Sequence, residues 1–331
     1  MRKQMASTVA CPHCHSALRL NIGFHRRDEI WDGEFVCGKC KVVYPLFLER
    51  AILLREDDIH SWTAPIQELL GIDEPVESPL FLGKLKEIGI EKALEMAKDS
   101  EKKLSIEEAS AENLQKLRSQ VQYIRSWQWF SHKAREHRFW EALNTPSPSV
   151  VEFIETVKAH QPKKVVDLLS GSGSGVVALG NALPDSTQFY AIERDLRCLW
   201  IIHEKFRAIK KVENVEPIGA DVRYLPFVDQ SFEMATSMMG VQELVGIRQF
   251  LDEVSRILTD GGHYVALMNK EPWLYDEISA DEYKKFAGET DLFVDAESFR
   301  QLAIERGLQP VKEQFFTEDE KELYLVDFQK R

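Results

Sequence analysis

The sequence lacks any run of about 18 apolar residues, the length that a membrane-spanning helix requires. Its first residues, MRKQMASTVACPHC, contain basic side chains but no apolar segment of the kind found in a secretory signal. Positive charge is in deficit, with 42 Lys and Arg against 54 Asp and Glu and a net charge of −12. This deficit argues against a nucleic-acid binder that relies on attraction over its whole surface, although a local basic patch stays open. We expect a cytoplasmic protein that does not enter a membrane.

Three segments of different character follow one another along the 331 residues, without internal repeats. Residues 1–56 hold most of the cysteines and short β-type runs such as KVVYPLFL. Residues 57–148 lack strand signals: an acidic, proline-containing connector leads into helical periodicity. Residues 149–331 alternate strand-like and helical patterns, which is typical of βαβ units and a mostly parallel sheet. We therefore expect a small cysteine domain, a linker with a helical segment, and a C-terminal α/β domain.

The cysteines of the first segment form two C-x-x-C units, C-P-H-C and C-G-K-C. Paired units of this kind in an intracellular chain indicate metal ligands before they indicate disulfides. Each tight turn can aim two thiolates at one tetrahedral Zn²⁺, and four filled positions favour a structural ion over a catalytic one. The predicted zinc ligands are Cys11, Cys14, Cys37 and Cys40.

The C-terminal segment begins after the loop NTPSPS, where Ser149 and Glu152 have the spacing of a capping box and predict a helix start. Strands are expected at KVVDLL, TQFYAIE, VEPIG, FEMATS and HYVALM, with a D-G-G turn before the last of these. Two more strands, PVKEQFF and ELYLVDFQK, are joined by a short connection and should be antiparallel neighbours. His203 and His263 fall within the helix and strand patterns, and we expect structural roles for both.

A glycine-rich stretch, VVDLLSGSGSGVVALG, follows the first of these strands, where doubly wound sheets bind ligands. The dinucleotide fingerprint G-x-G-x-x-G fits Gly171 and Gly173 but finds Val176 in place of the third glycine. The S-adenosylmethionine pattern D/E-x-G-x-G-x-G fits Asp167 and the same two glycines but finds Leu169 in place of the first. The loop alone is compatible with either cofactor, or with a plain tight turn.

Residues farther along the chain complete a nucleotide pocket. Glu193 ends the second strand about 20 residues past the glycines, where a carboxylate can accept hydrogen bonds from ribose hydroxyls. Asp221 follows the third strand and can accept from an adenine amine, while the backbone N–H of Val222 can meet a ring nitrogen.

Four motifs in order, DLLSGSGSG, YAIERD, ADVRYLPFVDQSF and EVSRILTDGG, make residues 150–331 similar to the class I S-adenosylmethionine-dependent methyltransferases. The likeness is closest to the subgroup that acts on small molecules and includes quinone-biosynthesis methyltransferases. It implies a Rossmann-like sheet of seven strands with the last one antiparallel, S-adenosylmethionine as cofactor, and methyl transfer as the activity.

The resemblance also implies a set of cofactor-binding residues. Asp167 would lie near the methionine amino group, and Met238 would line the side nearest the sulfonium. Leu169 departs from the family's glycine, and its side chain could crowd the cofactor. Because methyl transfer needs mainly alignment of the acceptor, no catalytic residue is implied. Gln242 and Glu243 are better placed to touch an acceptor than the two histidines, and a solvated or helix-starting role fits both at least as well. The full cofactor set is Asp167, Ser170, Gly171, Gly173, Glu193, Asp221, Val222 and Met238.

The cysteine segment, with CPHCHSALRL and FVCGKCKVVYPLFLERAILL, resembles small zinc-ribbon proteins over residues 9–56. These include activator subunits that bind and stabilise methyltransferases acting on tRNA, rRNA and translation factors. A ribbon ahead of a methyltransferase domain implies that the ribbon stabilises the catalytic domain or helps to present the acceptor.

The intervening stretch YIRSWQWFSHKAREHRFWEAL, residues 123–143, combines aromatic side chains with positive charge. It is compatible with an RNA-contacting helix, but two apolar stripes favour a helix packed between domains. The methyl acceptor is therefore open. A small molecule is favoured, with an RNA or protein acceptor as the alternative, and a non-catalytic scaffold that binds the cofactor is a second alternative.

Overall fold

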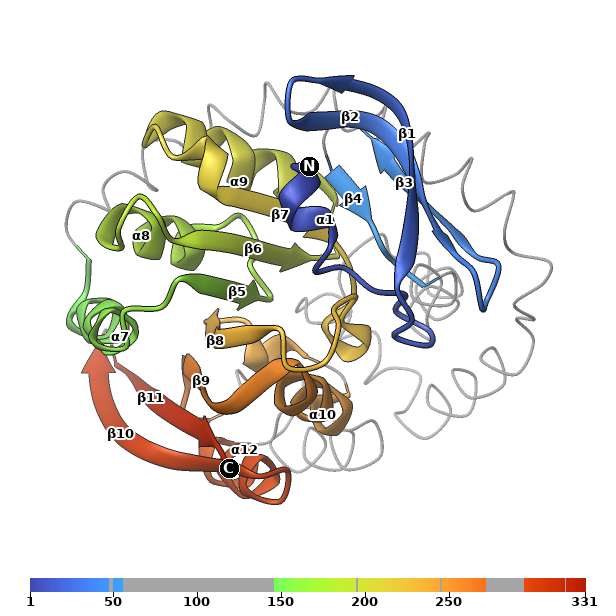
Figure 1. Ribbon diagram of the computed structural model, residues 1–331. Coiled ribbons are helices and arrows are strands. Elements are labelled where there is room, and N and C mark those ends of the chain that lie inside the picture. Colours follow the sequence, from blue (N-terminus) through green and yellow to red (C-terminus); the bar gives the residue numbers. More distant parts are fainter. Residues whose placement is uncertain (48–49, 56–145, 195, 245, 272–294, 319) are drawn as a thin grey trace, which may run out of the picture.

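The computed structural model describes residues 1–47, 50–55, 146–194, 196–244, 246–271, 295–318 and 320–331. Their strands form a single sheet of eleven in the order β1-β2-β3-β4-β7-β6-β5-β8-β9-β11-β10. Figure 1 shows the N-terminal strands, in blue, at one edge and the last two strands, in red, at the other. No helix among the described residues is long and apolar enough to cross a membrane.

Seven strands of this sheet come from the C-terminal part of the chain, and the expected α/β fold with a Rossmann-like sheet is confirmed. Five of them run parallel, whereas β11 is antiparallel to both of its neighbours, as the terminal hairpin predicts. The strands are β5 (Lys164–Leu168), β6 (Gln188–Glu193), β7 (Val215–Gly219), β8 (Phe232–Met238), β9 (Leu258–Asn269), β10 (Leu308–Glu318) and β11 (Lys321–Lys330). The D-G-G sequence predicted as a turn lies inside β9. Gly261 has a φ of 76° there, so the backbone departs from the extended conformation at this residue.

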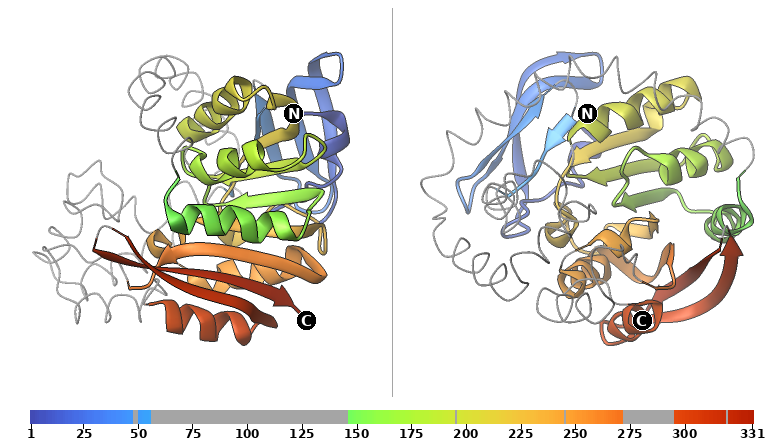
Figure 2. Two further views of the ribbon diagram at one scale, coloured as in Figure 1. Left: turned by 90° about the vertical axis from the view of Figure 1, so that its left-hand side faces the viewer. Right: turned by 180° about the vertical axis from the view of Figure 1, so that it is seen from behind.

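The sheet separates two layers of apolar side chains, because successive residues of a strand point to opposite faces. Val165 belongs to one layer and its neighbour Val166 to the other. The first layer receives α7 (Pro148–Ala159), α8 (Ser174–Ala182) and α9 (Leu196–Ala208); the second receives α10 (Ile247–Ile257) and α12 (Ala296–Ile304). Parallel strands covered on both faces explain the nearly continuous apolar runs in the sequence. The N- and C-termini lie near opposite edges of the sheet (Figure 2).

The cysteine segment contributes the other four strands and does not form a sheet of its own. They are β1 (Leu18–Arg26), β2 (Glu29–Cys37), β3 (Val43–Phe47) and β4 (Arg50–Ile52), preceded by the short helix α1 (Lys3–Ala6). Strand β4 pairs in parallel with β7, with Ala51 opposite Ile218, and the N–H of Leu53 donates to the Gly219 carbonyl at 2.6 Å. The expected seven-stranded sheet is thus extended to eleven strands, because the ribbon adds its strands to the β7 edge.

A second seam joins the cysteine segment to the C-terminal domain through the backbone ahead of the first cysteine pair. The Ala10 N–H donates to the Pro226 carbonyl at 2.8 Å, and the Val228 N–H donates to the Thr8 carbonyl at 3.3 Å. The Thr8 hydroxyl also accepts from Lys164 and Tyr190. Buried side chains of the ribbon belong to the same apolar cluster as those of α10. Described residues of the ribbon and of the C-terminal part thus contribute to one apolar cluster, and the division into domains 1–56, 57–148 and 149–331 stays a prediction.

The first helix of the C-terminal part begins differently from the capping box expected at Ser149. Helix α7 has Ser147 as its N-cap and Pro148 in its first turn, and no side chain of the helix caps it. The carboxylate of Glu318, from β10, accepts from the Ser149 N–H at 2.7 Å and from its hydroxyl at 2.9 Å. The capping-box prediction was wrong because a distant carboxylate takes the place of Glu152.

Candidate functional site

The glycine loop joins the carboxyl end of β5 to the first turn of α8. Gly171 and Gly173 have φ angles of 50° and 85°, a region in which glycine is favoured, and Gly173 is the N-cap of α8. A Cβ atom at Gly171 would have no heavy atom within 4 Å, whereas one at Gly173 would lie 2.7 Å from Ile202. Gly171 therefore borders open space, into which a ligand can approach the backbone, and Gly173 is required by packing.

Glu193, at the end of β6, reaches this loop directly. Its Oε2 atom accepts a hydrogen bond from the Gly171 N–H at 2.8 Å. The Glu193 carbonyl in turn accepts from the Ala220 N–H, which places Asp221 beside the same strand end. The structure thus brings Gly171, Glu193 and Asp221 together at the carboxyl ends of three neighbouring strands, where ligands bind in folds of this type.

Asp167 lies beneath the loop and is 2 % exposed. Its Oδ1 atom accepts from the Thr236 hydroxyl at 2.8 Å, and the Ser170 hydroxyl donates to its carbonyl oxygen at 2.9 Å. Burial raises the pKa of the Asp167 carboxyl to about 7 against the opposing effect of these hydroxyls. A buried carboxyl with such a pKa is ready to ionise when a cationic group approaches it.

Leu169, the departure from the glycine pattern, adopts the left-handed conformation that the missing glycine would adopt, with a φ of 58°. Its side chain packs against the apolar cluster on the α10 face of the sheet. Gly240, in the loop after β8, makes room for it: a Cβ at Gly240 would lie 2.6 Å from the Leu169 Cβ. A leucine thus fits here because a glycine stands opposite, on the neighbouring strand's loop.

Met238 ends β8 and lies against the start of α8. A Cβ at Gly175 would fall 3.0 Å from the Met238 Cβ and 3.6 Å from its sulfur. Beyond it, Val241–Glu243 form a short 3-10 helix. In it, Gln242 donates through Nε2 to the Met239 carbonyl at 2.7 Å. The Oε1 atom of Gln242 is buried and has no hydrogen-bond partner among the described residues, so it could accept from a ligand. The side chain of Glu243 lies outside the described part.

Asp221 is 3 % exposed and is paired with an arginine that the sequence did not single out. Arg223 donates to Asp221 through its Nε at 2.9 Å, through a terminal nitrogen at 2.7 Å and through its backbone N–H at 2.8 Å. Burial acts to raise the pKa of the Asp221 carboxyl, but the hydrogen bonds and charge of Arg223 outweigh it and hold the pKa below its usual value. Asp221 is therefore ionised and fixed in place, with Val222 buried beside it.

The motif EVSRILTDGG has a structural role next to this site. Glu253 accepts from the Leu225 N–H at 2.6 Å, and Arg256 donates to the carbonyls of Leu225 and Phe227 at 2.9 and 2.7 Å. The two side chains also pair with each other at 2.8 Å. Together they hold the Leu-Pro-Phe loop that follows Asp221, which explains why the two motifs occur together.

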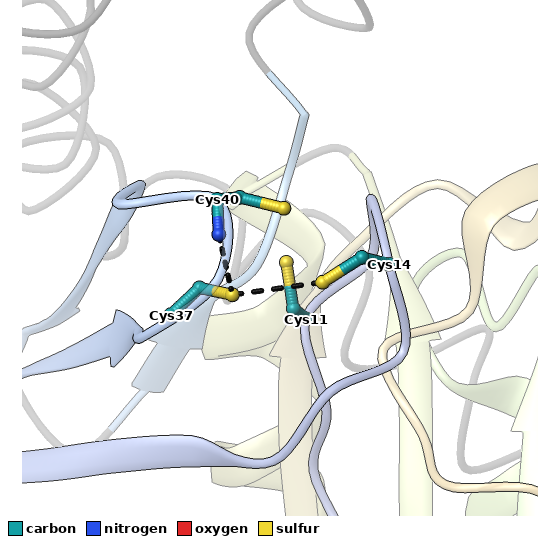
Figure 3. Close-up of side chains that lie close together, drawn as sticks. All are labelled: Cys11, Cys14, Cys37 and Cys40. Carbon is teal, nitrogen blue, oxygen red and sulfur yellow. Dashed lines mark hydrogen bonds between the residues drawn. The ribbon is translucent and has the colours of Figure 1, made fainter.

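The four cysteines converge at the base of the ribbon (Figure 3). One ligand atom from each lies within 4.8 Å of the others, and the Cys14 and Cys37 sulfurs are 3.6 Å apart. A tetrahedral Zn²⁺ with bonds of 2.3 Å would hold its sulfurs about 3.8 Å apart. The Cys40 N–H donates to the Cys37 sulfur, and the Tyr44 hydroxyl lies 3.4 Å from the Cys11 sulfur. The residues therefore fit a zinc ion, as their spacing predicts.

The structure places the predicted cofactor residues on adjoining strand ends, although whether they bind a cofactor stays a prediction. The sequence reasoning missed Thr236, Arg223 and the Glu253–Arg256 pair. Arg223 has a local signal, an arginine two residues after a buried aspartate, and Glu253 and Arg256 belong to the quoted motif EVSRILTDGG, to which the sequence reasoning gave no structural role. The aromatic stretch of residues 123–143 lies outside the described residues.

Comparisons with known protein families agree with both halves of the chain. The family described as "Methyltransferase domain" matches residues 165–262, and the family "Trm112p-like protein" matches residues 2–47. The chain thus carries a class I S-adenosylmethionine-dependent methyltransferase domain behind a Trm112p-like zinc ribbon.

Individual relatives match about half of the chain. The ubiquinone/menaquinone biosynthesis C-methyltransferase of Shewanella frigidimarina is 25% identical over 195 residues, which cover 53% of this chain and 74% of that protein. The demethylmenaquinone methyltransferase of Geobacillus stearothermophilus is 25% identical over 158 residues, covering 44% and 67%.

Among solved structures, the YcgJ protein of Bacillus subtilis aligns with a TM-score of 0.44 at 15% identity, covering 55% of this chain and 98% of that one. The geranyl diphosphate C-methyltransferase of Streptomyces coelicolor aligns with a TM-score of 0.42 at 13% identity, covering 51% and 72%.

Proposed function

We propose that the protein transfers a methyl group from S-adenosylmethionine to a small-molecule acceptor. The observation that carries the proposal is the glycine loop: open space adjoins Gly171, next to the carboxylates of Asp167, Glu193 and Asp221. The names of the relatives, which are quinone-biosynthesis methyltransferases at about a quarter identity, favour a small acceptor.

In this proposal each residue binds or orients one part of the cofactor. Asp167 faces the amino group of the cofactor, and Glu193 accepts hydrogen bonds from the ribose. Asp221 and the Val222 N–H bind the adenine. Ser170, Gly171 and Gly173 supply the backbone around the methionine portion, with Met238 beside the sulfur. The fixed carboxylate of Asp221 supports this assignment, because Arg223 supplies three donors, two from its guanidinium and one from its backbone, which leaves acceptor capacity for one further donor.

S-adenosylmethionine would supply a methyl group that is already electrophilic, so the chain needs to align an acceptor and exclude water. Gln242 is the side chain best suited to orient that acceptor, since its buried Oε1 can accept a hydrogen bond from a hydroxyl or amine. Leu169 packs toward Gly240. This direction supports the proposal that the leucine side chain does not obstruct the cofactor site.

A matched pair of glycine variants tests the cofactor site. Gly171 and Gly261 both have positive φ angles, 50° and 76°, and a Cβ at either would have no heavy atom within 4 Å. Alanine therefore costs about the same backbone strain, 1–2 kcal/mol, at both positions. Gly171→Ala should weaken S-adenosylmethionine binding measured by calorimetry at least tenfold, and Gly261→Ala should leave it unchanged. Equal affinities in both variants would refute the site.

The acceptor class can be identified with labelled methyl groups. The purified protein is incubated with methyl-labelled S-adenosylmethionine and cell extract, which is then separated into small molecules, RNA and protein. Label in the small-molecule fraction supports the proposal. The Trm112p-like ribbon favours the alternative, an RNA or protein acceptor, and label that is removed by nuclease or protease would establish it. Tight cofactor binding without any transfer would indicate the scaffold.

We also propose that Cys11, Cys14, Cys37 and Cys40 hold a structural Zn²⁺. Burial and the neighbouring thiols raise the pKa of Cys40 to about 12. At Cys14 burial is outweighed by hydrogen bonds with Ser16, Cys40 and Cys37, which lower the pKa to about 6, so the ionisation of one thiol is favoured at the expense of another. A bound cation removes that conflict, since it binds all four as thiolates. Cys14→Ser should lower the zinc content and the melting temperature. Cys198→Ser, outside the cluster, is the control and should keep the zinc content.

A further inference from the structure

Two histidines and an aspartate meet at the end of the sheet opposite the glycine loop. His160 is the C-cap of α7, His263 lies on β9 and Asp327 on β11. His263 is in register with Met234, which pairs with Val165 near the start of β5. The cluster therefore lies toward the amino ends of the central strands, whereas the glycine loop leaves the carboxyl end.

The three side chains point at one another. The His160 Nε2 is 2.7 Å from one Asp327 oxygen, and the His263 Nδ1 is 2.8 Å from the other. The imidazole rings lie with their centroids 3.8 Å apart and their planes inclined by 33°. One ligand atom from each residue falls within 4.8 Å of the other two.

The charge on Asp327 needs a partner, because the residue is only 3 % exposed. Its cross-strand neighbour Lys312 does not supply one, since its amine bonds to Glu152 and Thr156 of α7. Among the described residues, only the two imidazoles contact the Asp327 carboxylate in an ion pair. The end of α7 adds the negative pole of a helix dipole, which favours a cation at His160.

We propose that His160, His263 and Asp327 bind a divalent transition-metal ion, Zn²⁺ by the chemistry of the donors, at a site distinct from the cysteine cluster. Two imidazoles and a carboxylate are a common zinc donor set that leaves a position for water. The His160 side chain is 29 % exposed, which gives the ion and its water access from solvent. Such an ion would fasten the end of α7 to β9 and to the C-terminal strand.

The geometry requires a small adjustment. Bonds of about 2.1 Å in a tetrahedron place donor atoms about 3.4 Å apart, so the nitrogen–oxygen separations of 2.7 and 2.8 Å must widen by about 0.7 and 0.6 Å. Rotation of the half-exposed His160 ring can supply this. Gln329 provides the second partner that a metal-bound histidine needs: its side-chain amide lies 3.4 Å from the His263 Nε2. Turning that amide over would let its oxygen accept from an Nε2–H once Nδ1 binds the metal, in exchange for the bond that the amide nitrogen now donates to the Gly261 carbonyl at 3.3 Å.

The test is the zinc content of the full-length protein after equilibration in a zinc-buffered solution, measured by elemental analysis. We expect two ions per chain in the wild type and one in His160→Ala and His263→Ala. His25→Ala removes an exposed imidazole on β1 and is the matched control, which should keep two. Cobalt separates the sites, since only the cysteine cluster gives thiolate-to-metal charge-transfer absorption.

Two results would overturn the proposal. One is a single zinc per chain in the wild type; the other is a second ion that both histidine variants retain. In the first case the carboxylate and the two imidazoles would only be hydrogen-bonded to one another, without a metal ion. Because His160 is at an exposed helix end, its alanine variant keeps the test available if Asp327→Asn fails to fold.

Discussion

Replacing Gly240 by alanine should destabilise the protein through a single contact. The Gly240 backbone, with φ −114° and ψ −23°, lies in a region open to any residue, so alanine brings no backbone strain there. Its Cβ would lie 2.6 Å from the Leu169 Cβ and 3.1 Å from the Leu169 carbonyl oxygen. Overpacking of this kind costs about 1–3 kcal/mol of unfolding free energy.

The reasoning makes a sharper statement about pairs of variants. Leu169→Gly removes the opposing Cβ, and its φ of 58° suits glycine, so Gly240→Ala should cost much less in that background, where only the 3.1 Å approach to the carbonyl oxygen of residue 169 is left. Leu169→Ala keeps the Cβ at the same 2.6 Å and should give little rescue. Urea unfolding of the single and double variants yields the coupling energy, which we expect at about 1–3 kcal/mol for the glycine pair. Additivity within about 0.5 kcal/mol, or equal rescue by alanine and glycine at Leu169, would refute the interpretation.

Four further predictions concern the pH dependence of stability, the pH dependence of cofactor affinity, the removal of zinc and the start of α7. Because burial raises the pKa of Asp167 to about 7, this carboxyl binds more protons in the folded than in the unfolded chain from about pH 4 to pH 7. Its contribution to the unfolding free energy should therefore fall as the pH rises through this window. Asp167→Asn should reduce the fall in pH-dependent urea titrations, and buried Glu216, whose pKa is also raised, should contribute the rest. The proposed cationic cofactor should bind the ionised form, so its affinity, measured by calorimetry, should rise with pH up to about 7 and then level off. Removing zinc with a chelator should weaken cofactor binding, because the backbone of Thr8 pairs with the loop after Asp221; unchanged affinity in the metal-free chain would contradict this coupling. Glu318→Gln should cost about 1–2 kcal/mol of unfolding free energy by weakening the charged hydrogen bonds to the start of α7, and a loss below about 0.3 kcal/mol would show that water replaces them.

The strands of the catalytic half could be predicted because they are buried on both faces, and runs such as KVVDL and QFYAIE are correspondingly apolar. The hairpin of β1 and β2 was not predicted. Most of β1 is exposed, including Phe24 at 58 %, so its side chains carry no alternation between core and solvent. The pairing of β4 with β7 joins residues far apart in sequence, and no local pattern specifies such a contact.

The site was predictable to the same extent. Glycines with positive φ and the carboxylates at strand ends follow from local pattern, and so do the four cysteines. That a leucine fits at position 169 could not be predicted from the local pattern, because the fit depends on Gly240 in the loop after the neighbouring strand. The Glu318 cap of α7 is a long-range contact of the same kind. In each case the role of one residue depends on a second residue that is distant in the sequence and close only in the folded chain.

The pairing of β4 with β7 also bears on how the two halves can be produced. In the whole chain β4 covers the outer edge of β7, whose five residues are all buried. A catalytic half made without residues 1–55 would present that edge to other molecules, and an uncovered apolar edge strand tends to pair with its like and aggregate. Because β4 and β7 belong to the same polypeptide, every C-terminal half has one β4 strand to pair with, and the pair does not dissociate on dilution. The catalytic half is thus protected from self-association from the moment that the whole chain has folded.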